Sequence, residues 1–398
     1  MTEHSAALPP QLRQRVAEFL ADHDPKTTER LQFLRARYDA GLAWLHFPTG
    51  HGGMGLPRDF QPEVDRLFAD AGAPDNNSKV NNIGLGMAAP TILEFGNDDQ
   101  KARFLRPLWT GEEIWCQLFS EPGAGSDLAA LATRAVRDGE DWVVNGQKVW
   151  TSSAHNARFA ILLARTAPSA PKHAGLTYFL CDMAEPGVEV RPLRQITGEA
   201  EFNEVFLSDV RIPDSHRLGA EGAGWRIANA TLNYERIVIG AEVARREAGM
   251  VGIVARAWRE NPELRTDELH SRLMKLWVDA EVARHMGRRL RQKLVSGQPG
   301  PEGAAMKLIF AELNQKLSGL EVELRGELGL RYSHWTAVRP DHVDMLGRDA
   351  GYRYLRAKGN SIEGGTSEIL RNILAERVLG LPPESRPDKD IPWKDLEK

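Results

Sequence analysis

A single carboxylate interrupts an apolar helical stripe near the middle of the chain. Steps of four, three, four and four residues, the spacing of one helix face, connect Ala228, Leu232, Glu235, Ile239 and Val243. Every member except Glu235 is apolar. Burying an unpaired carboxylate is costly and raises its pKa, and such a group can remove a weakly acidic C–H proton near neutral pH. Glu235 is therefore a candidate general base, with a structural ion pair, for example to Arg236, as the alternative.

A second candidate carboxylate, Glu363, lies in the stretch N-S-I-E-G-G-T-S-E-I-L-R-N, residues 360–372. Two glycines follow it, and then Thr366 and Ser367, hydroxyl residues of the kind that cap a helix. A helix N-terminus with free N–H groups suits a phosphate or another electron-rich group of a ligand. A plain capped helix start is the alternative interpretation of these residues.

Two further segments combine glycine, hydroxyl and aromatic residues in a way that suits a flat ligand. Ser120–Asp127 reads S-E-P-G-A-G-S-D, where glycines allow close approach of the backbone and serines can form hydrogen bonds. Trp150-Thr151-Ser152 ends an expected strand, so its indole could cover a ring system. Each segment could equally be an ordinary loop or strand exit. By contrast, G-H-G-G-M-G at 50–55 has no surrounding βαβ pattern and is interpreted as a loop.

Composition limits the class of protein. The chain has 398 residues, a net charge of −4 and a pI near 6.3, which argues against a nucleic-acid or anionic-membrane surface. Two cysteines exclude a disulfide framework, no histidine spacing predicts a metal site, and no apolar run is long enough for a membrane span. Without a recognisable signal peptide, a cytoplasmic location is expected.

Three regions of the chain differ in hydrophobic period. Helical spacing over 11–111 gives way to β-type runs over 116–213, in which Asn145-Gly146 predicts a hairpin with a type I′ turn. Long helical patterns follow at 225–258, 268–294 and 303–328, with a last helix at 368–379. The polar, proline-rich end is expected to be disordered or extended. We therefore predict a helical domain 1–115, an antiparallel β domain 116–220, a helical domain 221–382 and a tail 383–398.

Four motifs in register resemble the acyl-CoA dehydrogenase family. They are F-S-E-P-G-A-G-S-D at 119–127, N-G-Q-K-V-W-T-S-S at 145–153, V-R-I-P at 210–213, and G-G-T-S-E-I-L-R-N at 364–372. The resemblance runs from about Phe47 to Leu381. It implies an α+β multidomain fold with an N-terminal helical domain, a middle antiparallel β domain and a C-terminal four-helix bundle.

The resemblance also implies a FAD site and an acyl-CoA site where the domains meet. The positions that match cofactor-binding residues are Phe119, Ser120, Gly125, Ser126, Trp150, Thr151, Ser152, Thr366 and Glu368. The positions that match substrate-binding residues are Ser126, Asn233, Arg236 and Gly364.

Two branches of the family place the base differently. Aligning Gly365-Thr366 with the loop of the medium-chain branch puts Gly364 at the base position and Glu363 one residue too early. In the long-chain and isovaleryl branches the base belongs to an E-R pair on the helix after the β domain, which Glu235-Arg236 matches. The sequence therefore favours Glu235 as the base, with Glu363 as the alternative.

The reaction implied is dehydrogenation of an acyl-CoA thioester to a trans-2-enoyl-CoA. The α-proton would pass to Glu235 and the β-hydride to flavin N5, with electrons passed on to an electron-transferring flavoprotein. A homotetramer, a dimer or a heterotetramer is expected. The alternatives are an acyl-CoA oxidase that uses O2 and a non-catalytic subunit of a heterotetramer. Neither Q-x-x-G-G-x-G nor Arg-x-x-Phe, which hold FAD in relatives, is evident in the C-terminal region.

Overall fold

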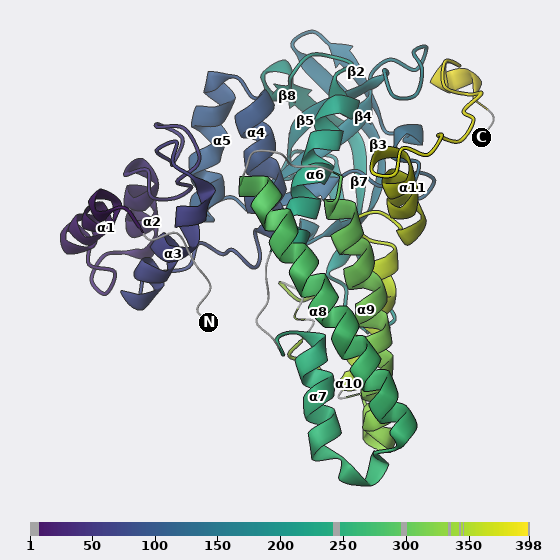
Figure 1. Cartoon of the computed structure of the whole chain (residues 1–398). Coiled ribbons are helices and arrows are strands. Elements are labelled where there is room, and N and C mark those ends of the chain that lie inside the picture. Colours follow the sequence, from purple (N-terminus) through teal and green to yellow (C-terminus); the bar gives the residue numbers. More distant parts are fainter. Residues whose placement is uncertain are drawn as a thin grey trace.

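The chain folds into a group of N-terminal helices, a β-sheet and a long bundle of C-terminal helices (Figure 1). The structure is a computed structural model that describes residues 8–241, 247–295, 301–332, 336–341, 344 and 346–396. This is the predicted α+β arrangement in the predicted order along the chain. The domain boundaries at 115, 220 and 382 stay predictions.

The N-terminal helices pack around an aromatic core. Their bounds are α1 Pro10–Asp22, α2 Arg30–Asp39, α3 Gln61–Asp70, α4 Ala89–Phe95 and α5 Asp98–Thr110. Phe33 and Phe68 are buried at the centre, with ring centroids 6.2 Å apart in an edge-to-face arrangement. Helix α5 begins with a capping box between Asn97 and Gln100 and ends at a left-handed Gly111. Local sequence thus sets both ends of this helix.

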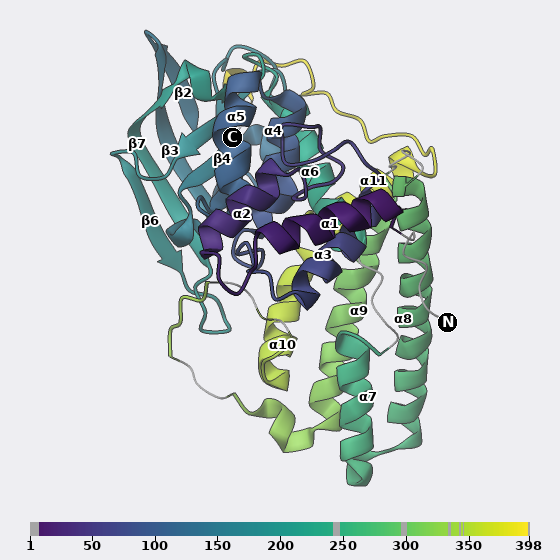
Figure 2. The ribbon, with the colours of Figure 1, turned by 90° about the vertical axis from the view of Figure 1, so that its left-hand side faces the viewer.

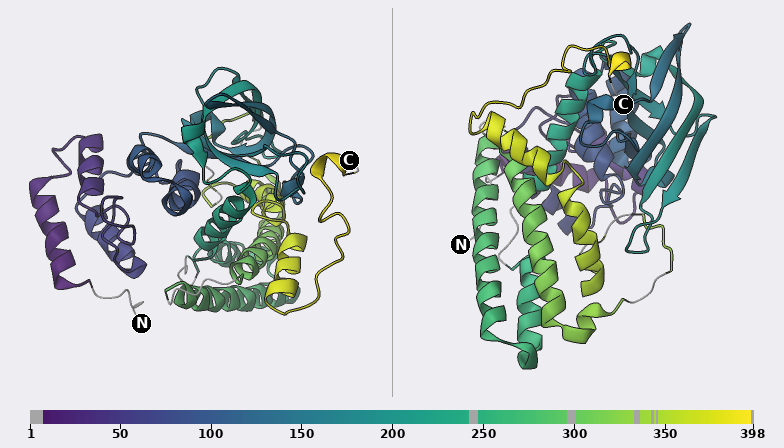
Figure 3. Two further views of the ribbon diagram at one scale, coloured as in Figure 1. Left: turned by 90° about the horizontal axis from the view of Figure 1, so that it is seen from above. Right: turned by 90° about the vertical axis from the view of Figure 1, so that its right-hand side faces the viewer.

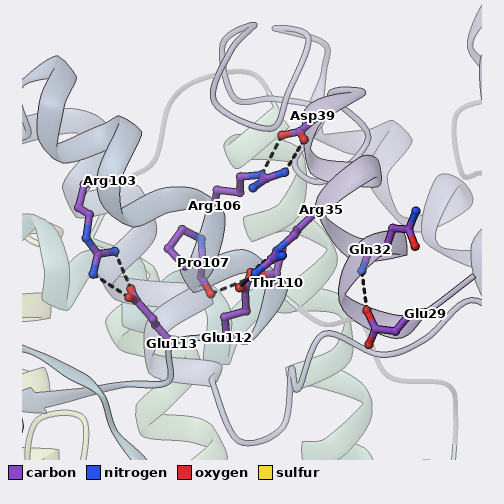
Figure 4. A network of polar contacts seen from close by, with 10 residues as sticks. All are labelled: Glu29, Gln32, Arg35, Asp39, Arg103, Arg106, Pro107, Thr110, Glu112 and Glu113. Atoms are coloured by element: carbon purple, nitrogen blue, oxygen red, sulfur yellow. Dashed lines mark hydrogen bonds and ion pairs between the residues drawn. The ribbon is translucent and has the colours of Figure 1, made fainter.

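Ion pairs join α5 to its neighbours at the surface (Figure 4). Arg106 binds Asp39 at the end of α2 at 2.6 Å, and Arg103 binds Glu113 at 2.8 Å. Arg35 of α2 reaches Glu112, whose carboxylate also accepts a hydrogen bond from Thr110. These side chains are partly exposed, so solvent screening keeps the contribution of each pair to stability small.

The middle region is an eight-stranded sheet ordered β6-β7-β3-β2-β4-β5-β8, with β1 paired to β4. The strand bounds are β1 Trp115–Leu118, β2 Arg134–Asp138, β3 Asp141–Ser152, β4 Phe159–Arg165, β5 Leu176–Asp182, β6 Val188–Leu193, β7 Phe202–Pro213 and β8 Arg217–Leu218. Most neighbours are antiparallel, as predicted, but β1 and β2 run parallel to β4. Strands β4 and β5 are almost wholly buried because helices cover one face of them and residues of β3 and β7 pack on the other.

The predicted hairpin at Asn145-Gly146 is wrong. Strand β3 runs straight through both residues, and the turn lies at Gly139, between β2 and β3, where φ is +62°. The Asn145 side chain instead exchanges two hydrogen bonds with Asp209 of β7, of 2.9 and 3.0 Å. A Cβ on Gly146 would lie 2.3 Å from Thr133 Oγ1. Close packing, and not a turn, requires glycine at this position.

The C-terminal helices form a bundle that extends away from the sheet (Figure 2). Their bounds are α6 Gly224–Ala241, α7 Met250–Glu260, α8 Asp267–Val295, α9 Gly303–Leu324, α10 Ala350–Ala357 and α11 Ser367–Arg377. Helix α9 contacts all of the other five. The single pattern predicted over 225–258 is divided between α6 and α7, and residues 242–246 lie outside the described part of the chain. Within that part, no helix has both the length and the hydropathy of a membrane span.

The C-terminal tail docks on the sheet region (Figure 3). Trp393 donates a 3.1 Å hydrogen bond to the carbonyl of Ala130, and the Arg165 guanidinium lies 4.3 Å from the centre of the indole. Lys172 bridges Asp127 and Asp388 at 2.9 and 3.1 Å. The tail is extended, as predicted, and most of it is exposed, but Asp388 and the segment at Trp393 contact the sheet region. Sequence composition missed the docking because these contacts depend on a few residues.

Candidate functional site

Three buried hydroxyl groups join the three parts of the chain at helix α6. Thr231 of α6 lies 3.0 Å from Thr91 of α4 and 3.0 Å from Tyr178 of β5, measured between the hydroxyl oxygens. All three side chains are fully buried. At the start of the same helix, a Cβ on Gly224 would lie 2.7 Å from the backbone of Leu176, so glycine lets α6 approach β5. These contacts fix where α6 lies relative to the sheet.

Glu235 follows Thr231 by four residues, which places its backbone on the same face of α6, one turn further along. The preceding members of the stripe face inward as predicted: Ala228 is buried and Leu232 packs on the main core. The side chains of Glu235 and Arg236 lie outside the described residues. Asn233, a predicted substrate-binding residue, is exposed on the same helix. The roles of all three residues stay predictions.

Glu363 takes part in an ion-pair network around the buried Arg356, with its own side chain 35% exposed. Its carboxylate accepts hydrogen bonds of 3.1 and 2.8 Å from Arg356 of α10 and one of 2.6 Å from Asn360. Arg356 is buried and also lies 3.5 Å from Glu201, just before β7. The raised pKa of Glu201 results from burial, which outweighs the opposing charge of Arg356. Arg356 therefore links the segment before β7 to the glycine loop, and it binds Glu363 from the side of α10.

The S-E-P-G-A-G-S-D segment is a tight turn held by a buried ion pair. Backbone groups of Glu121 and Ala124 exchange two 3.0 Å hydrogen bonds. The Lys148 ammonium, which is 0% exposed, donates to Glu121 at 2.8 Å and to the carbonyls of Phe119 and Leu163 at 3.0 and 2.9 Å. Pro122 and Gly123 are exposed at the tip of the turn, and Gly125 and Ser126 are exposed directly after it. Lys148 thus secures the base of the turn and leaves its tip open to a ligand.

Trp150 has an unusual backbone conformation for an aromatic residue. Its φ is +61°, where β3 bulges against β7, and its side chain is 57% exposed. The indole packs edge-to-face on Phe202 at 5.8 Å, and the preceding amide, of Val149, donates to the carbonyl of Ser120. A side chain in the left-handed region costs roughly 1–2 kcal/mol. Such strain concentrates at ligand sites, where the surrounding fold maintains it.

The residues that follow this tryptophan offer hydroxyl groups. Thr151 is buried, and its hydroxyl has no hydrogen-bond partner among the described residues. Ser152 is half-buried at the end of β3. The Ser153 amide donates to the carbonyl of Glu201, which brings the strand end against the Arg356 network. The predicted flavin-covering residues are therefore adjacent to the S-E-P-G turn through Ser120 and to the glycine loop through Arg356.

The glycine loop leads into helix α11 as predicted. Gly364 and Gly365 have φ values of +63° and +93°. Thr366 is the N-cap, and its hydroxyl accepts a 3.2 Å hydrogen bond from the Ile369 amide. The hydroxyl of buried Ser367 has no partner within the described ranges. Glu368 is largely exposed, so it can reach a ligand or another chain.

The donors at these segments fit a flavin dinucleotide. An exposed indole suits a flat ring system, and the unsatisfied hydroxyls of Thr151 and Ser367 can bond its polar edge. The N-terminus of α11 suits the negative part of such a ligand. Sequence reasoning missed Glu121, Lys148, Arg356 and Lys307, which hold these segments from inside. The signal that could have indicated them is a charged residue at a position where the strand or helix pattern predicts a buried side chain.

Comparison with known proteins agrees with this arrangement. Family models for the N-terminal, middle and C-terminal domains of acyl-CoA dehydrogenases match residues 7–112, 116–210 and 222–379. Acyl-CoA dehydrogenase IpdE1 of Mycobacterium tuberculosis is 40% identical over 87% of this chain and 86% of its own length.

Two solved structures are similar over nearly the whole chain. The Tcur3481-Tcur3483 steroid ACAD has a TM-score of 0.72 at 26% identity, over 95% of this chain and 99% of that chain. The ChsE4-ChsE5 complex of Mycobacterium tuberculosis has a TM-score of 0.69 at 26% identity, over 95% and 100%.

The chain belongs to the acyl-CoA dehydrogenase family. This is an oxidoreductase family, and its members depend on a flavin. The family and the fold expected from the four motifs are thereby confirmed, while the roles of individual site residues stay predictions.

Replacing Lys148 should destabilise the protein strongly. Lys148→Met leaves the Glu121 carboxylate buried and unpaired, so we expect the free energy of unfolding to fall by about 3–5 kcal/mol in denaturant titrations. The double variant Glu121→Gln/Lys148→Met should recover part of that loss. Arg191→Met, which removes an exposed ion pair with Glu189, is the control and should change little. Equal effects of Lys148→Met and Arg191→Met would contradict the assignment.

The same pair predicts a pH dependence. Burial alone would raise the pKa of Glu121, but the charge of Lys148 and hydrogen bonds from Lys148, Thr133 and Ala132 lower it below 4.5. A lowered folded-state pKa stabilises the fold fully above the unfolded value, and the stabilisation disappears as pH falls through the folded value. Unfolding measured between about pH 6 and 3 should therefore show a weaker acid dependence in Lys148→Met than in the wild type. Parallel curves would contradict this.

Trp150→Gly should cost little stability although it removes an indole. Glycine relieves the positive φ but loses about 0.5–1 kcal/mol in backbone entropy, so the free energy of unfolding should stay within about 1 kcal/mol of the wild type. FAD affinity, measured by fluorescence titration, should fall at least tenfold. Trp142→Gly, at a buried position of the same strand, is the comparison and should cost about 3–5 kcal/mol. Wild-type FAD affinity in Trp150→Gly would argue against a flavin at this indole.

Proposed function

We propose that this protein dehydrogenates an acyl-CoA thioester to a trans-2-enoyl-CoA, with Glu235 as the base. The observation that carries the proposal is the convergence of the turn at 120–127, the strand end at 150–152 and the loop at 364–368, through Ser120, Glu201 and Arg356. FAD, when bound, would accept the hydride that leaves Cβ. Residues Ser120–Ser126, Trp150–Ser152, Thr366 and Glu368 would hold it.

The chain's own residues would remove the α-proton and stabilise the negative charge that develops on the thioester oxygen. Glu235 would take the α-proton, and the electron pair of that C–H bond would form the Cα–Cβ double bond as the hydride departs from Cβ. An α-proton is too weakly acidic for a carboxylate unless the thioester carbonyl is polarised. The Gly364 amide would donate to that carbonyl oxygen, as in an oxyanion hole. Ser126, Asn233 and Arg236 would position the CoA part of the substrate.

The surroundings of Glu363 support Glu235 as the base. Both carboxylate oxygens of Glu363 accept hydrogen bonds from Arg356, and Oε1 also accepts one from Asn360. A base must turn a free lone pair toward the substrate, and these contacts direct Glu363 toward α10 instead. Glu235 follows Thr231, whose hydroxyl contacts Thr91 and Tyr178, by one helical turn. We assign Glu363 a structural role in the loop.

We further propose a bulky, steroid-derived acyl group as the substrate class and an electron-transferring flavoprotein as the acceptor. The similarity to a structure described as a steroid ACAD supports the first assignment. Assembly with further chains is supported by helix α8, where Met274, Val278, Val282 and Met286 form an exposed apolar stripe at four-residue spacing. The similarity to a complex of two named chains favours a heteromer as the form to test against a homotetramer. A cytoplasmic location stays a prediction.

Anaerobic bleaching of the flavin absorbance tests the function and the base together. Wild type should bleach with at least one thioester in a panel of short, long, branched and steroid-like acyl-CoAs. Glu235→Gln should lower the bleaching rate about 10²–10⁴-fold, the usual contribution of a general base, while keeping its FAD. Glu363→Gln should stay within about tenfold of the wild type.

Each other result has a defined meaning. Loss of bleaching in Glu363→Gln alone, with FAD retained, would transfer the base to the glycine loop. Steady peroxide formation in air at the rate of turnover would favour an oxidase. Bleaching with no thioester, alone or mixed with candidate partner chains, would indicate a non-catalytic subunit.

A further inference from the structure

Lys307 is a buried cation directly behind the glycine loop. It is the fifth residue of α9 and is only 2% exposed. Its ammonium donates to the carbonyl of Asn360 at 2.8 Å and to the carbonyl of Gly365 at 2.7 Å. Burial of an ammonium is expensive unless it is well hydrogen-bonded, so a position chosen for stability alone would favour an apolar residue. We therefore look for the role of this cation in its two hydrogen bonds to loop carbonyls.

The geometry of a peptide bond transmits this contact to the other side of the loop. A trans peptide is planar, and its C=O and N–H point in opposite directions. Because the Gly365 carbonyl points at Lys307 on α9, the Thr366 amide of the same peptide points away from α9. The cation also polarises that peptide, which makes its N–H a stronger donor.

Glycine alone would not hold this orientation. Gly364 and Gly365 both lie at positive φ, and residues without a Cβ can rotate between several peptide orientations at little cost. The other contacts of the loop act further upstream: Asn314 of α9 binds Asn360, and Arg356 binds Glu363. Lys307 holds the glycine carbonyl itself.

The Thr366 amide is available to a ligand. The Thr366 hydroxyl accepts from the Ile369 amide and its carbonyl from the Leu370 amide, so both are used within α11. Among the described residues, none accepts a hydrogen bond from the Thr366 N–H. The neighbouring Ser367 hydroxyl is likewise buried and unsatisfied. We propose that Lys307 is a positioning residue that locks the Gly365–Thr366 peptide so that the Thr366 N–H is presented to FAD.

This inference rests on the proposed function, because it takes FAD as the ligand at the start of α11. The first test is FAD affinity, measured by fluorescence titration on purified protein. Lys307→Met keeps the length of the side chain and removes its charge, and it should weaken FAD binding at least tenfold. Lys316→Met, an exposed lysine of the same helix, should stay within twofold of the wild type.

Two substitutions of Thr366 separate the amide from the helix cap. Thr366 has φ −63°, which proline adopts without strain. Thr366→Pro removes the N–H, whereas Thr366→Ala keeps it and removes only the capping hydroxyl. We expect Thr366→Pro to weaken FAD binding at least tenfold more than Thr366→Ala does. Equal affinity of these two variants would overturn the proposal, even if Lys307→Met failed to fold.

The double variant Lys307→Met/Thr366→Pro tests whether the residues act through one peptide. We expect the double variant to bind FAD as tightly as the weaker-binding of the two single variants. The reason is that the lysine acts through the amide that proline removes. Multiplicative effects, or wild-type FAD affinity in Lys307→Met, would overturn the proposal. A purely structural lysine would lower the melting temperature without this coupling.

Hydrogen exchange of the FAD-free protein adds a readout that needs no cofactor. Faster exchange in Lys307→Met, confined to residues 361–370, is expected, and exchange unchanged there would contradict the lock. If the wild type binds FAD and bleaches with an acyl-CoA while Lys307→Met matches it, only this inference fails. If the wild type binds no FAD, the proposed function fails and the inference fails with it.

Discussion

Buried cationic side chains bind the inner side of the segments that we expect to face the ligand. The turn at 120–127 and the loop at 364–368 are rich in glycine, serine and threonine, so they bury too little apolar surface to be fixed by hydrophobic packing. Lys148 fixes the first, and Lys307 and Arg356 fix the second. Each is buried and donates to carbonyl or carboxylate oxygens on the inner side of its segment. The outer side of each segment is thereby left free for a ligand.

The same constraint explains why Arg356 connects two regions of the chain. A buried charge must be compensated locally, and the oxygens that compensate it come from whichever elements meet there. Lys148 on β3 binds the carbonyls of Phe119 and Leu163 within the β region, while Arg356 on α10 crosses to Glu201 next to β7. Helix α6 is positioned by uncharged groups instead, through hydrogen bonds among the hydroxyls of Thr231, Thr91 and Tyr178. Chemistry at the junction of the three parts therefore depends on interactions that also hold those parts together.

Strain at Trp150 belongs to the same arrangement. The bulge between β3 and β7 turns an aromatic residue outward at positive φ, and the bonds of Val149 to Ser120 and of Ser153 to Glu201 hold both sides of it. An exposed indole at a strained position contributes little to folding. It is more easily explained by a ligand that covers it.

The sequence by itself determined the family, the order of helical and β regions, the cap at Thr366 and the inward-facing positions Ala228 and Leu232 of α6. These features are local, because periodicity, capping residues and contiguous motifs depend on neighbours within a few positions. The tertiary structure decided that β3 continues through Asn145-Gly146 without a turn, that the tail docks through Trp393, and that Glu363 is bound by Arg356. It also revealed Lys307, whose partners are 53 and 58 residues away. A single chain carries no record of which distant carbonyl a buried cation will meet, because that depends on how the elements pack.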